Sequence, residues 1–408
     1  MAPRDLDVLL LGATGFTGAL TAAELATRAT GTRLRWGVAG RDRGRLERLA
    51  RDLPGRPEVV VTDVTDAASL AAAAARTRVL ATTVGPYAAL GAPVARACAA
   101  AGTHYADITG EPAFVAALER EVDPVARASG ATMVVCCGFD SVPHDLGAQL
   151  AVAHLPDDAS MAVRGYVRAR GRLSGGTART ALAVLGGRPD ADAPDAATAT
   201  GAEDVRPRAV RSARRLDLGA HRPTRLGGWA VPLPTIDPLI VLRSARVLPG
   251  YGTSFAYGHY AHVRRTATLV GAGLGLGAAA VAARTAPGRR ALERLLPDPG
   301  EGPDAAARAA GGFTVLMLGS ARGTSEAAAE AARRGGAEDV AVVVRVRGGD
   351  PGCGGTARML AEAALTLASD ERPDVAGVVT PAVGLGAPYR RRLEGSGMTF
   401  EVVEAPPA

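Results

Sequence analysis

The chain has 408 residues, of which 47% are hydrophobic and 22% are charged. This composition supplies enough apolar material for one or two folded domains and excludes wholesale disorder. Basic residues outnumber acidic ones by 47 to 41, and every one of the 47 is arginine. The modest net charge of +6 does not indicate a nucleic-acid partner, and the lack of lysine excludes Schiff-base enzymes and Walker-type phosphate loops.

The cysteine pattern and the N-terminus point to a reduced compartment. The four cysteines have no metal-ligand spacing and predict no disulfide framework; they are Cys98, Cys136, Cys137 and Cys353. The first residues lead directly into an apolar run and do not have the three regions of a secretory signal. We therefore expect a cytoplasmic protein that holds no metal.

The first 145 residues alternate short apolar runs with alanine-rich stretches. Six strands are expected, at 7–11, 33–39, 58–62, 79–83, 105–108 and 132–137. Because strands that alternate with helices at this spacing are joined by right-handed crossovers, the pattern predicts a doubly wound parallel sheet of the Rossmann type. Residues 1–145 form the expected nucleotide-binding domain.

The regular alternation of strands and helices ends in residues 146–353. We expect this region to form a second, α+β domain on a mixed or antiparallel sheet, for substrate binding or dimerisation. Strands are expected at 161–168, 210–218 and 338–347, a helix at 174–185, and an exposed excursion at 186–209. The tail returns to helix, strand, helix and strand, at 355–368, 375–380, 387–393 and 398–403. We expect residues 354–397 to pack back on the first domain.

Residues 266–283 contain no charge and lie between arginines. Their length and flanks fit a peripheral membrane contact, but the stretch is rich in glycine and alanine, which makes it only weakly hydrophobic. Its glycines also have the spacing of close helix contacts. Shallow membrane contact, a buried or dimer-forming helix, and a true span all remain open at this point.

A glycine fingerprint directly follows the first expected strand and opens the first helix. The residues that we assign to cofactor binding in it are Gly12, Thr14, Gly15, Phe16, Thr17 and Gly18. Such a turn brings the backbone close to a diphosphate and presents the free N–H groups and positive dipole of a helix N-terminus. The spacing is GxxGxxG, and the strand–turn–helix context makes it significant.

The end of the second strand indicates which dinucleotide binds. A site for NAD places an acidic residue there, whereas this chain has Arg41. Because a guanidinium matches a phosphate in charge and in its fork of donors, we predict NADP(H). Asp42 argues against this but lies one position further, and Arg48 and Arg51 fit a solvated helix face better.

Later strand ends add to the expected cofactor site. Asp63 follows the third strand and either bonds the adenine or caps the next helix. Val84, Gly85 and Pro86 follow the fourth strand and let the chain pass beneath the nicotinamide ribose. Because the carboxyl ends of parallel strands meet at one edge, these turns converge on one crevice.

Two loops at that edge, residues 102–111 and 137–145, gather titratable groups beside glycines. The plausible proton donors or substrate-holding groups in them are His104, Tyr105, Asp107, Glu111, Asp140 and His144. Turn caps and half-buried core are the alternative interpretation for each residue. We select His104, Tyr87 and Asp140 as candidate catalytic residues, with solvent as a further proton source.

Several motifs together resemble the saccharopine dehydrogenase-like oxidoreductases, and most closely the bacterial trans-acting enoyl reductases. They are GATGFTG (12–18), AGR (39–41), TTVGPY (82–87), GTHYADITGE (102–111), CGFDSVPHDLG (137–147), SGGTARTAL (174–182), the aromatic run 251–260, GDPGCGGTARMLAEAAL (349–365) and GVVTPAVGLG (377–386). The resemblance covers nearly the whole chain. It implies a Rossmann domain with a discontinuous second domain, NADP(H), frequent membrane association, and reduction of a C=C bond on a polyketide or lipid precursor in glycolipid assembly.

Three functions therefore stay open on the sequence. The first is an NADPH-dependent reductase acting on a bulky, apolar acyl chain that is free or carrier-bound. The second is a saccharopine-type C–N oxidoreductase, for which Arg208, Arg211, Arg214 and Arg215 could recognise the substrate or could form a solvated face. The third is a membrane-associated NADP-binding protein without turnover. We also expect peripheral contact with the plasma membrane and a homodimer as options for assembly.

Overall fold

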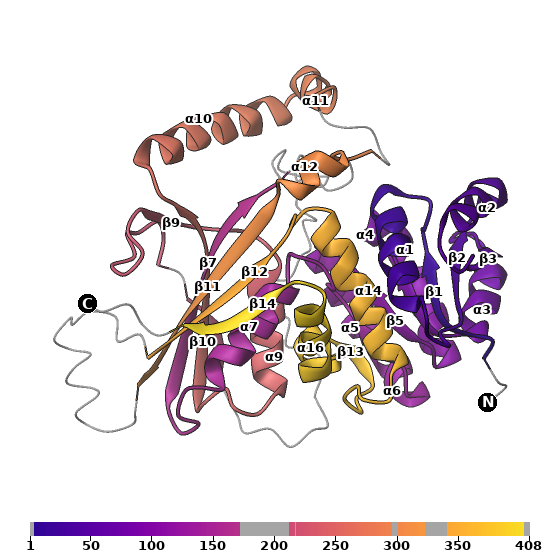
Figure 1. Cartoon of the computed structure of the whole chain (residues 1–408). Coiled ribbons are helices and arrows are strands. Elements are labelled where there is room, and N and C mark those ends of the chain that lie inside the picture. The colour runs from indigo at the N-terminus through magenta and orange to yellow at the C-terminus, as the bar shows by residue number, and fades with distance from the viewer. Residues whose placement is uncertain (1–3, 172–211, 217, 296–300, 323–340, 404–408) are drawn as a thin grey trace.

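The computed structural model describes residues 4–171, 212–216, 218–295, 301–322 and 341–403, which form two seven-stranded sheets and the helices around them. Figure 1 shows the parallel sheet on the right, with the second sheet and its long strands on the left. The predicted helix at 174–185 and the excursion at 186–209 lie outside the described residues.

Sheet A is parallel and has the strand order β13-β6-β5-β4-β1-β2-β3. Its strands are β1 (Leu6–Leu11), β2 (Trp36–Gly40), β3 (Glu58–Val61), β4 (Thr77–Thr82), β5 (His104–Asp107), β6 (Thr132–Val134) and β13 (Gly377–Val379). The chain order reverses beside β1, between β2 and β4, and a sheet of this kind binds ligands at such a switch point. The predicted Rossmann-type sheet is confirmed.

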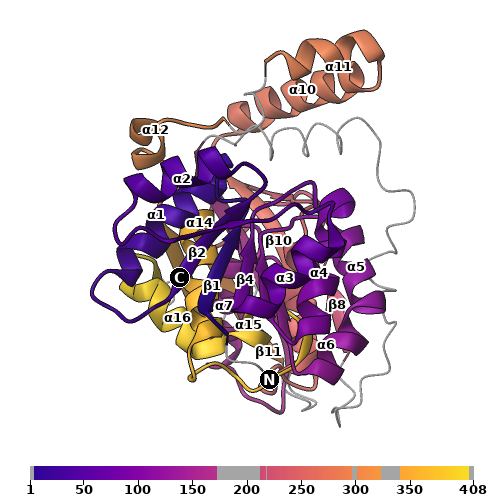
Figure 2. The ribbon, with the colours of Figure 1, turned by 90° about the vertical axis from the view of Figure 1, so that its right-hand side faces the viewer.

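Helices cover both faces of sheet A (Figure 2). On one face, α1 (Phe16–Ala29) packs against α14 (Gly354–Ala368), which also contacts α16 (Gly386–Gly395). On the other face lie α3 (Ala67–Arg76), α4 (Tyr87–Ala101), α5 (Pro112–Glu121) and α6 (Asp123–Ser129), while α2 (Arg43–Asp52) packs on β2 and β3.

Sheet B is mixed, with the order β14-β12-β11-β7-β10-β8 and β9 paired to β10. Its strands are β7 (Ser160–Arg170), β8 (Ser212–Arg215), β9 (Trp229–Pro232), β10 (Ser254–Val263), β11 (Gly312–Arg322), β12 (Val342–Gly348) and β14 (Thr399–Val403). The predicted mixed sheet is therefore confirmed, although the sequence interpretation did not assign β9, β10 and β11. The tail divides between the sheets, because β13 joins sheet A and β14 joins sheet B.

A helical layer joins the two sheets. The helices α7 (Val142–Val152) and α9 (Asp237–Val247) pack on strands of sheet B, and α7 directly follows the loop after β6. The short helix α15 (Pro381–Gly384) contacts both α7 and α9, and another short helix, α12 (Ala305–Ala309), directly precedes β11. One cluster of buried apolar side chains runs from Val8 of sheet A through Leu146 of α7 to Val167 and Val344 of sheet B. The two sheets therefore share a continuous core.

The uncharged stretch forms α10 (Thr266–Ala283), and α11 (Ala286–Glu293) follows it. Both helices stand away from the rest of the molecule at the top of Figure 1, so the prediction of a helix buried within the chain is wrong. None of the helices in the described part of the chain combines the length and apolarity needed to cross a bilayer.

The carboxylate of Asp123 should be one attachment of β13 to sheet A. Its Oδ1 accepts the N–H of Val378 at 2.7 Å, and its Oδ2 accepts Arg127 Nε at 2.6 Å. Because a buried hydrogen bond to a charged group contributes about 1.5–3 kcal/mol, we expect Asp123→Ala to lower the free energy of unfolding by about 2 kcal/mol. Urea denaturation measures this change. The fully exposed Asp370 provides the control, and equal stability of Asp123→Ala and Asp370→Ala would contradict the assignment.

Candidate active site at the carboxyl edge of sheet A

The turn after β1 is tightly packed and requires glycine at two positions. Gly12 has a φ of +86°, and a Cβ there would lie 2.8 Å from both Thr83 Oγ1 and Val84 Cγ2. A Cβ on Gly18 would lie 2.1 Å from the carbonyl oxygen of Gly12. The first turn of α1 therefore lies directly on the loop, and the loop lies directly on the end of β4.

The N-terminus of α1 leaves backbone N–H groups without side-chain partners among the described residues. Gly15 is its N-cap and no side chain caps the helix, so the first-turn N–H groups of Phe16 and Thr17 have no side-chain acceptor among the described residues. A Cβ on Gly15 would meet only the carbonyl oxygen of Gly12, at 3.4 Å. An uncapped helix N-terminus with an open approach is a binding site for phosphate groups.

The end of β2 presents a positive charge. Arg41 is exposed and lies close enough to Asp63 to lower the pKa of that carboxyl, although the hydrogen bonds from Thr65 lower it more. Asp42 instead turns into its own helix, where its carboxylate accepts the N–H of Arg45 at 2.9 Å and caps α2. Asp42, the acidic residue that counted against NADP in the sequence, is therefore the cap of a helix.

Asp63 follows β3 at the same edge. Its Oδ1 accepts hydrogen bonds from Thr65 N at 2.9 Å and Thr65 Oγ1 at 2.8 Å. The N-cap of α3 is Asp66, so the alternative in which Asp63 caps that helix is wrong.

The turn after β4 places Val84 against Gly12 and continues through Gly85 and Pro86 into α4. The carboxylate of Glu111 caps this helix from the neighbouring loop, accepting Tyr87 N at 2.9 Å and Ala88 N at 2.8 Å. The loops after β4 and β5 are thereby tied together.

Tyr87 is buried beneath this turn and bonded to backbone on both sides. Its hydroxyl donates to Thr82 O at 3.0 Å and accepts Ile108 N at 3.3 Å. Burial raises the pKa of Tyr87 well above the usual range. In this arrangement the phenol holds β4 to the end of β5.

His104 lies at the opposite edge of the sheet. It begins β5 and pairs in register with Val79. Its Nδ1 accepts Thr132 N at 3.0 Å, and burial lowers its pKa to about 3. His104 is therefore neutral and separated from the glycine turn by the length of the strand, so we leave it out of the site.

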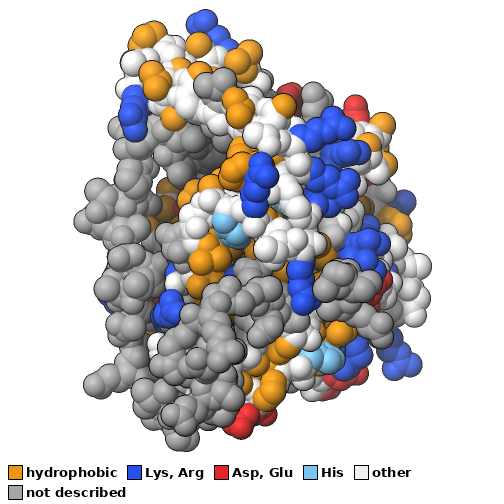
Figure 3. Space-filling view, turned by 90° about the vertical axis from the view of Figure 1, so that its left-hand side faces the viewer, with side chains coloured by type: hydrophobic (Ala, Val, Ile, Leu, Met, Phe, Trp, Pro, Cys, Tyr) orange, Lys and Arg blue, Asp and Glu red, His pale blue; other side chains and the backbone are white. Residues whose placement is uncertain are grey.

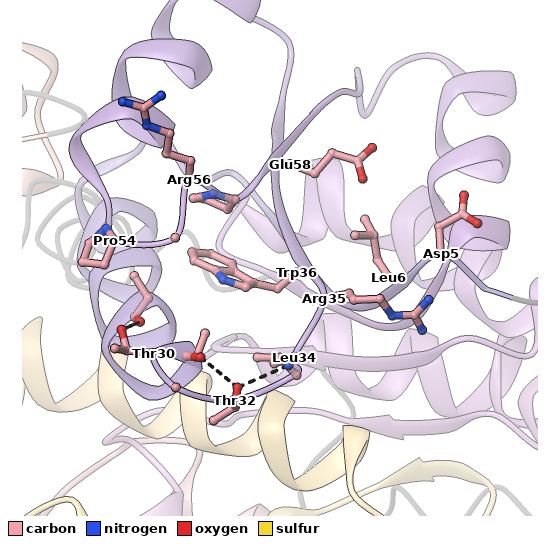
Figure 4. A pocket seen from close by; sticks show the side chains of 15 residues that line it. Asp5, Leu6, Thr30, Thr32, Leu34, Arg35, Trp36, Pro54, Arg56 and Glu58 are labelled. Carbon is pink, nitrogen blue, oxygen red and sulfur yellow. Dashed lines mark hydrogen bonds between the residues drawn. The ribbon is translucent and has the colours of Figure 1, made fainter.

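A pocket of about 600 Å³ opens at that same amino edge (Figure 4). Trp36 lies at its centre, with Arg35, Glu58 and Arg56 around it. These residues lie at the starts of β2 and β3 and in the loops that precede them, so this pocket is separate from the glycine turn.

Asp140 lies at the carboxyl edge, in the loop after β6. A Cβ on Gly110 would lie 3.5 Å from its Oδ2, which places the carboxylate beside the end of β5. The side chain is exposed, yet the surrounding protein and the charge of Asp237 raise its pKa to about 6, against the opposing effect of His144. Asp140 is thus an acid that can hold a proton near neutrality.

Behind Asp140 lies a buried cluster. His144 Nδ1 lies 2.6 Å from Asp237 Oδ1, and His259 Nε2 lies 3.5 Å from Asp237 Oδ2. Burial raises the pKa of Asp237, but the two histidines together lower it below its usual value. Burial also lowers the pKa of His259 to about 4. The three ligand atoms all lie within 4.8 Å of one another, a grouping that could hold a metal ion and that the sequence interpretation, which predicted no metal, did not identify.

One atom of the cluster is left unsatisfied. His144 Nε2 is buried and has no hydrogen-bond partner among the described residues. The ring of Phe139 lies 5.6 Å from that of His144 and 4.8 Å from that of Phe313. An unpartnered polar atom is therefore buried in a histidine ring that packs against Phe139.

The sequence interpretation missed Asp237, His259 and Arg308. Asp237 opens α9 and His259 lies within β10, some 100 residues from the loop that they approach. The guanidinium of Arg308 lies 5.8 Å from the ring centroid of Phe16, at the start of α1. Two signals in the sequence could have indicated the first two: Asp237 precedes a proline at the start of a helix, and His259 lies within the aromatic run 251–260.

The loop after β5 has a structural acid. Asp107 is buried and accepts Cys136 N at 2.9 Å, Thr109 N at 3.0 Å and the Tyr105 hydroxyl at 2.9 Å. Burial outweighs these bonds and raises its pKa to about 6. Asp107 and Tyr105 hold the loop that carries Asp140 against β5.

Comparison with known proteins identifies the family of the chain. The family model for the saccharopine dehydrogenase NADP-binding domain matches residues 8–134. A Mycobacterium tuberculosis protein with the provisional name of trans-acting enoyl reductase is 35% identical over 98% of both chains. A trans-acting enoyl reductase of Mycobacterium ulcerans is 32% identical over 97% of both chains. The structure of Saccharomyces cerevisiae saccharopine dehydrogenase (L-Glu forming) covers 98% of this chain with a TM-score of 0.53 at 14% identity, which shows a shared fold.

Replacing Arg41 tests the phosphate contact. We expect Arg41→Ala to weaken NADPH binding by about ten- to a hundred-fold, since a hydrogen-bonded charge contributes about 1.5–3 kcal/mol, and to leave NADH binding almost unchanged. Fluorescence titration of both nucleotides measures this. Arg51→Ala, on the exposed face of α2, is the matched control. Equal weakening of NADPH and NADH would refute the contact.

Proposed function

Since the chain belongs to the saccharopine dehydrogenase-like oxidoreductases, with full-length relatives among the trans-acting enoyl reductases, we propose that it reduces the C=C bond of an enoyl thioester with NADPH. The observation that carries this proposal is the similarity over 98% of both chains, which includes the second sheet as well as the cofactor domain. The substrate in this proposal is an intermediate of polyketide or lipid assembly.

The residues of the carboxyl edge fit the cofactor. The N–H groups of Phe16 and Thr17 would hold the diphosphate, with Gly15 allowing its approach. Arg41 would bind the 2′-phosphate, and Val84 and Gly85 would lie beneath the nicotinamide ribose. When bound there, NADPH would supply the hydride for the β-carbon of the enoyl group.

The protein would then supply a proton to the α-carbon. Asp140 is the candidate donor because it is exposed at the edge of the crevice and its pKa is raised to about 6. His144 and Asp237 lie behind it and act as positioning residues, because Asp237 adds to desolvation in raising the pKa of Asp140 and His144 opposes that rise. Transfer of one hydride and one proton completes the reduction.

Two aromatic side chains pack together at the loop that carries Asp140, and one of them, Phe313, is buried in the core. Phe139 and Phe313 lie side by side, and Phe139 N donates to Thr356 Oγ1 at 3.2 Å, which fixes the loop against α14. The main role of these groups would be to align the two carbons with the hydride and proton donors, which is a large part of such catalysis.

The activity is tested by following NADPH absorbance with a medium-chain enoyl thioester, presented on coenzyme A and on an acyl carrier. We expect NADPH consumption and a saturated thioester as the product by mass spectrometry. Tight NADPH binding without turnover of any enoyl thioester would contradict the proposal.

Asp140 should control the pH dependence. The pKa of Asp140 is raised to about 6, and the residue would act in its protonated form. We therefore expect kcat to be constant below about pH 6 and to fall as the pH rises above it. We expect Asp140→Asn to lower kcat by about 10²- to 10⁴-fold, leave NADPH affinity unchanged and abolish this fall. Asp158→Asn, on an exposed turn, is the control. A variant Asp140→Asn that keeps both kcat and the pH profile would exclude Asp140 as the donor.

A further inference from the structure

The helix α10 has a composition typical of a protein interior but lies outside it. Its 18 residues contain no charge. Two views at right angles show it standing clear of the two sheets, joined to them at its start by β10 (Figures 1 and 2). A helix that is apolar all round is normally enclosed by protein or lipid.

Nothing within the described chain encloses the middle of this helix. Val270 is 55% exposed and Val281 is 65% exposed. A Cβ built on any of its glycines would meet no atom within 4 Å; these are Gly271, Gly273, Gly275 and Gly277. Exposed apolar surface of this extent marks a binding face.

The charges around α10 are almost all positive. Residues 264–294 contain six arginines and one glutamate. Two of the arginines, Arg264 and Arg265, directly precede the helix, and Arg284 directly follows it. Figure 3 shows apolar and arginine side chains side by side over this part of the molecule, at the top of the view.

An aromatic side chain lies at the base of the helix. Trp229 is half-buried, its Nε1 donates to Thr266 Oγ1 at 3.0 Å, and the guanidinium of Arg222 lies 4.7 Å above its ring. Tryptophan and arginine together at the end of an apolar helix are typical of the boundary between lipid and water.

We propose that α10 and α11, the α10–α11 arm, dock on the surface of an anionic lipid bilayer. The uncharged helix would lie at the boundary between the lipid headgroups and the acyl chains. The arginines at its base and in α11 would contact lipid phosphates. A second copy of the chain fits less well, because two such arms would bring arginines together with almost no acidic residue to pair with them.

The arm is close in sequence to the cofactor edge. Gly302 lies against the start of α1, where a Cβ on it would lie 2.4 Å from the ring of Phe16. Docking would thus hold the carboxyl edge near the bilayer, where an apolar substrate is concentrated. The inference does not depend on the reaction, because binding is measured without substrate.

Vesicle flotation with the full chain tests the proposal. We expect binding to vesicles of phosphatidylcholine with phosphatidylglycerol at least ten-fold stronger than to phosphatidylcholine alone, and weaker at high salt because ions screen the arginines. Equal binding to both vesicle types, or to neither, overturns the proposal.

Two variants separate the apolar from the electrostatic contribution. Val270→Asp with Val281→Asp, both at exposed positions, should abolish binding, and Arg264→Glu with Arg265→Glu should weaken it at least ten-fold. The exposed arginines Arg120 and Arg391 give a control with the same change in charge, which should bind like the parent. Vesicle binding unaffected by both arm variants would overturn the proposal. The proposal would also be overturned if the parent chain formed a dimer in analytical ultracentrifugation, bound no vesicles, and lost its dimer in the variant Val270→Asp with Val281→Asp.

Discussion

The site depends on one close contact, the packing of the first turn of α1 on the loop after β1. Gly18 lies against the carbonyl of Gly12, and Gly12 in turn lies against Val84 at the end of β4. These contacts fix the direction of an uncapped helix N-terminus at the point where the strand order of sheet A reverses. Larger side chains at either glycine would push the helix away and remove the phosphate site.

A second constraint joins the cofactor edge to sheet B. Asp237 of α9 lies against His144, and His259 of β10 lies against Asp237. His144 is in the first turn of α7, which follows the loop after β6. The protonation of the exposed Asp140 is therefore linked to residues of both sheets. Because the two sheets also share one apolar core, Asp140 and the glycine turn lie on one continuous body.

Local signals in the sequence were sufficient for sheet A and the glycine turn. Strand–helix alternation predicted the parallel sheet, and the placement of Gly12, Gly15 and Gly18 follows from the tight turn that they form. The strand β10 could not be assigned in the same way, because it lies inside sheet B with residues buried on both faces. In β11, buried and partly buried positions alternate over 312–317, but one of the partly buried residues is Leu316, so the sequence does not show this alternation as apolar and polar.

Site residues were harder to predict because their environment is not local. The sequence places His104 near a glycine and a tyrosine, but only the direction of β5 shows that it begins the strand at the wrong edge. Asp237 and His259 reach the site through the fold. Asp42 follows β2, where a NAD site would place an acid on the ribose. The carboxylate of Asp42 caps α2 instead, which explains why an acid at this place does not indicate NAD.

A crystal structure of the NADPH complex tests the central claim most directly. The account predicts the diphosphate on the N–H groups of Phe16 and Thr17, the 2′-phosphate on Arg41, and the nicotinamide between Gly85 and Asp140. A nucleotide bound at the opposite edge, in the pocket beside Trp36, would contradict it.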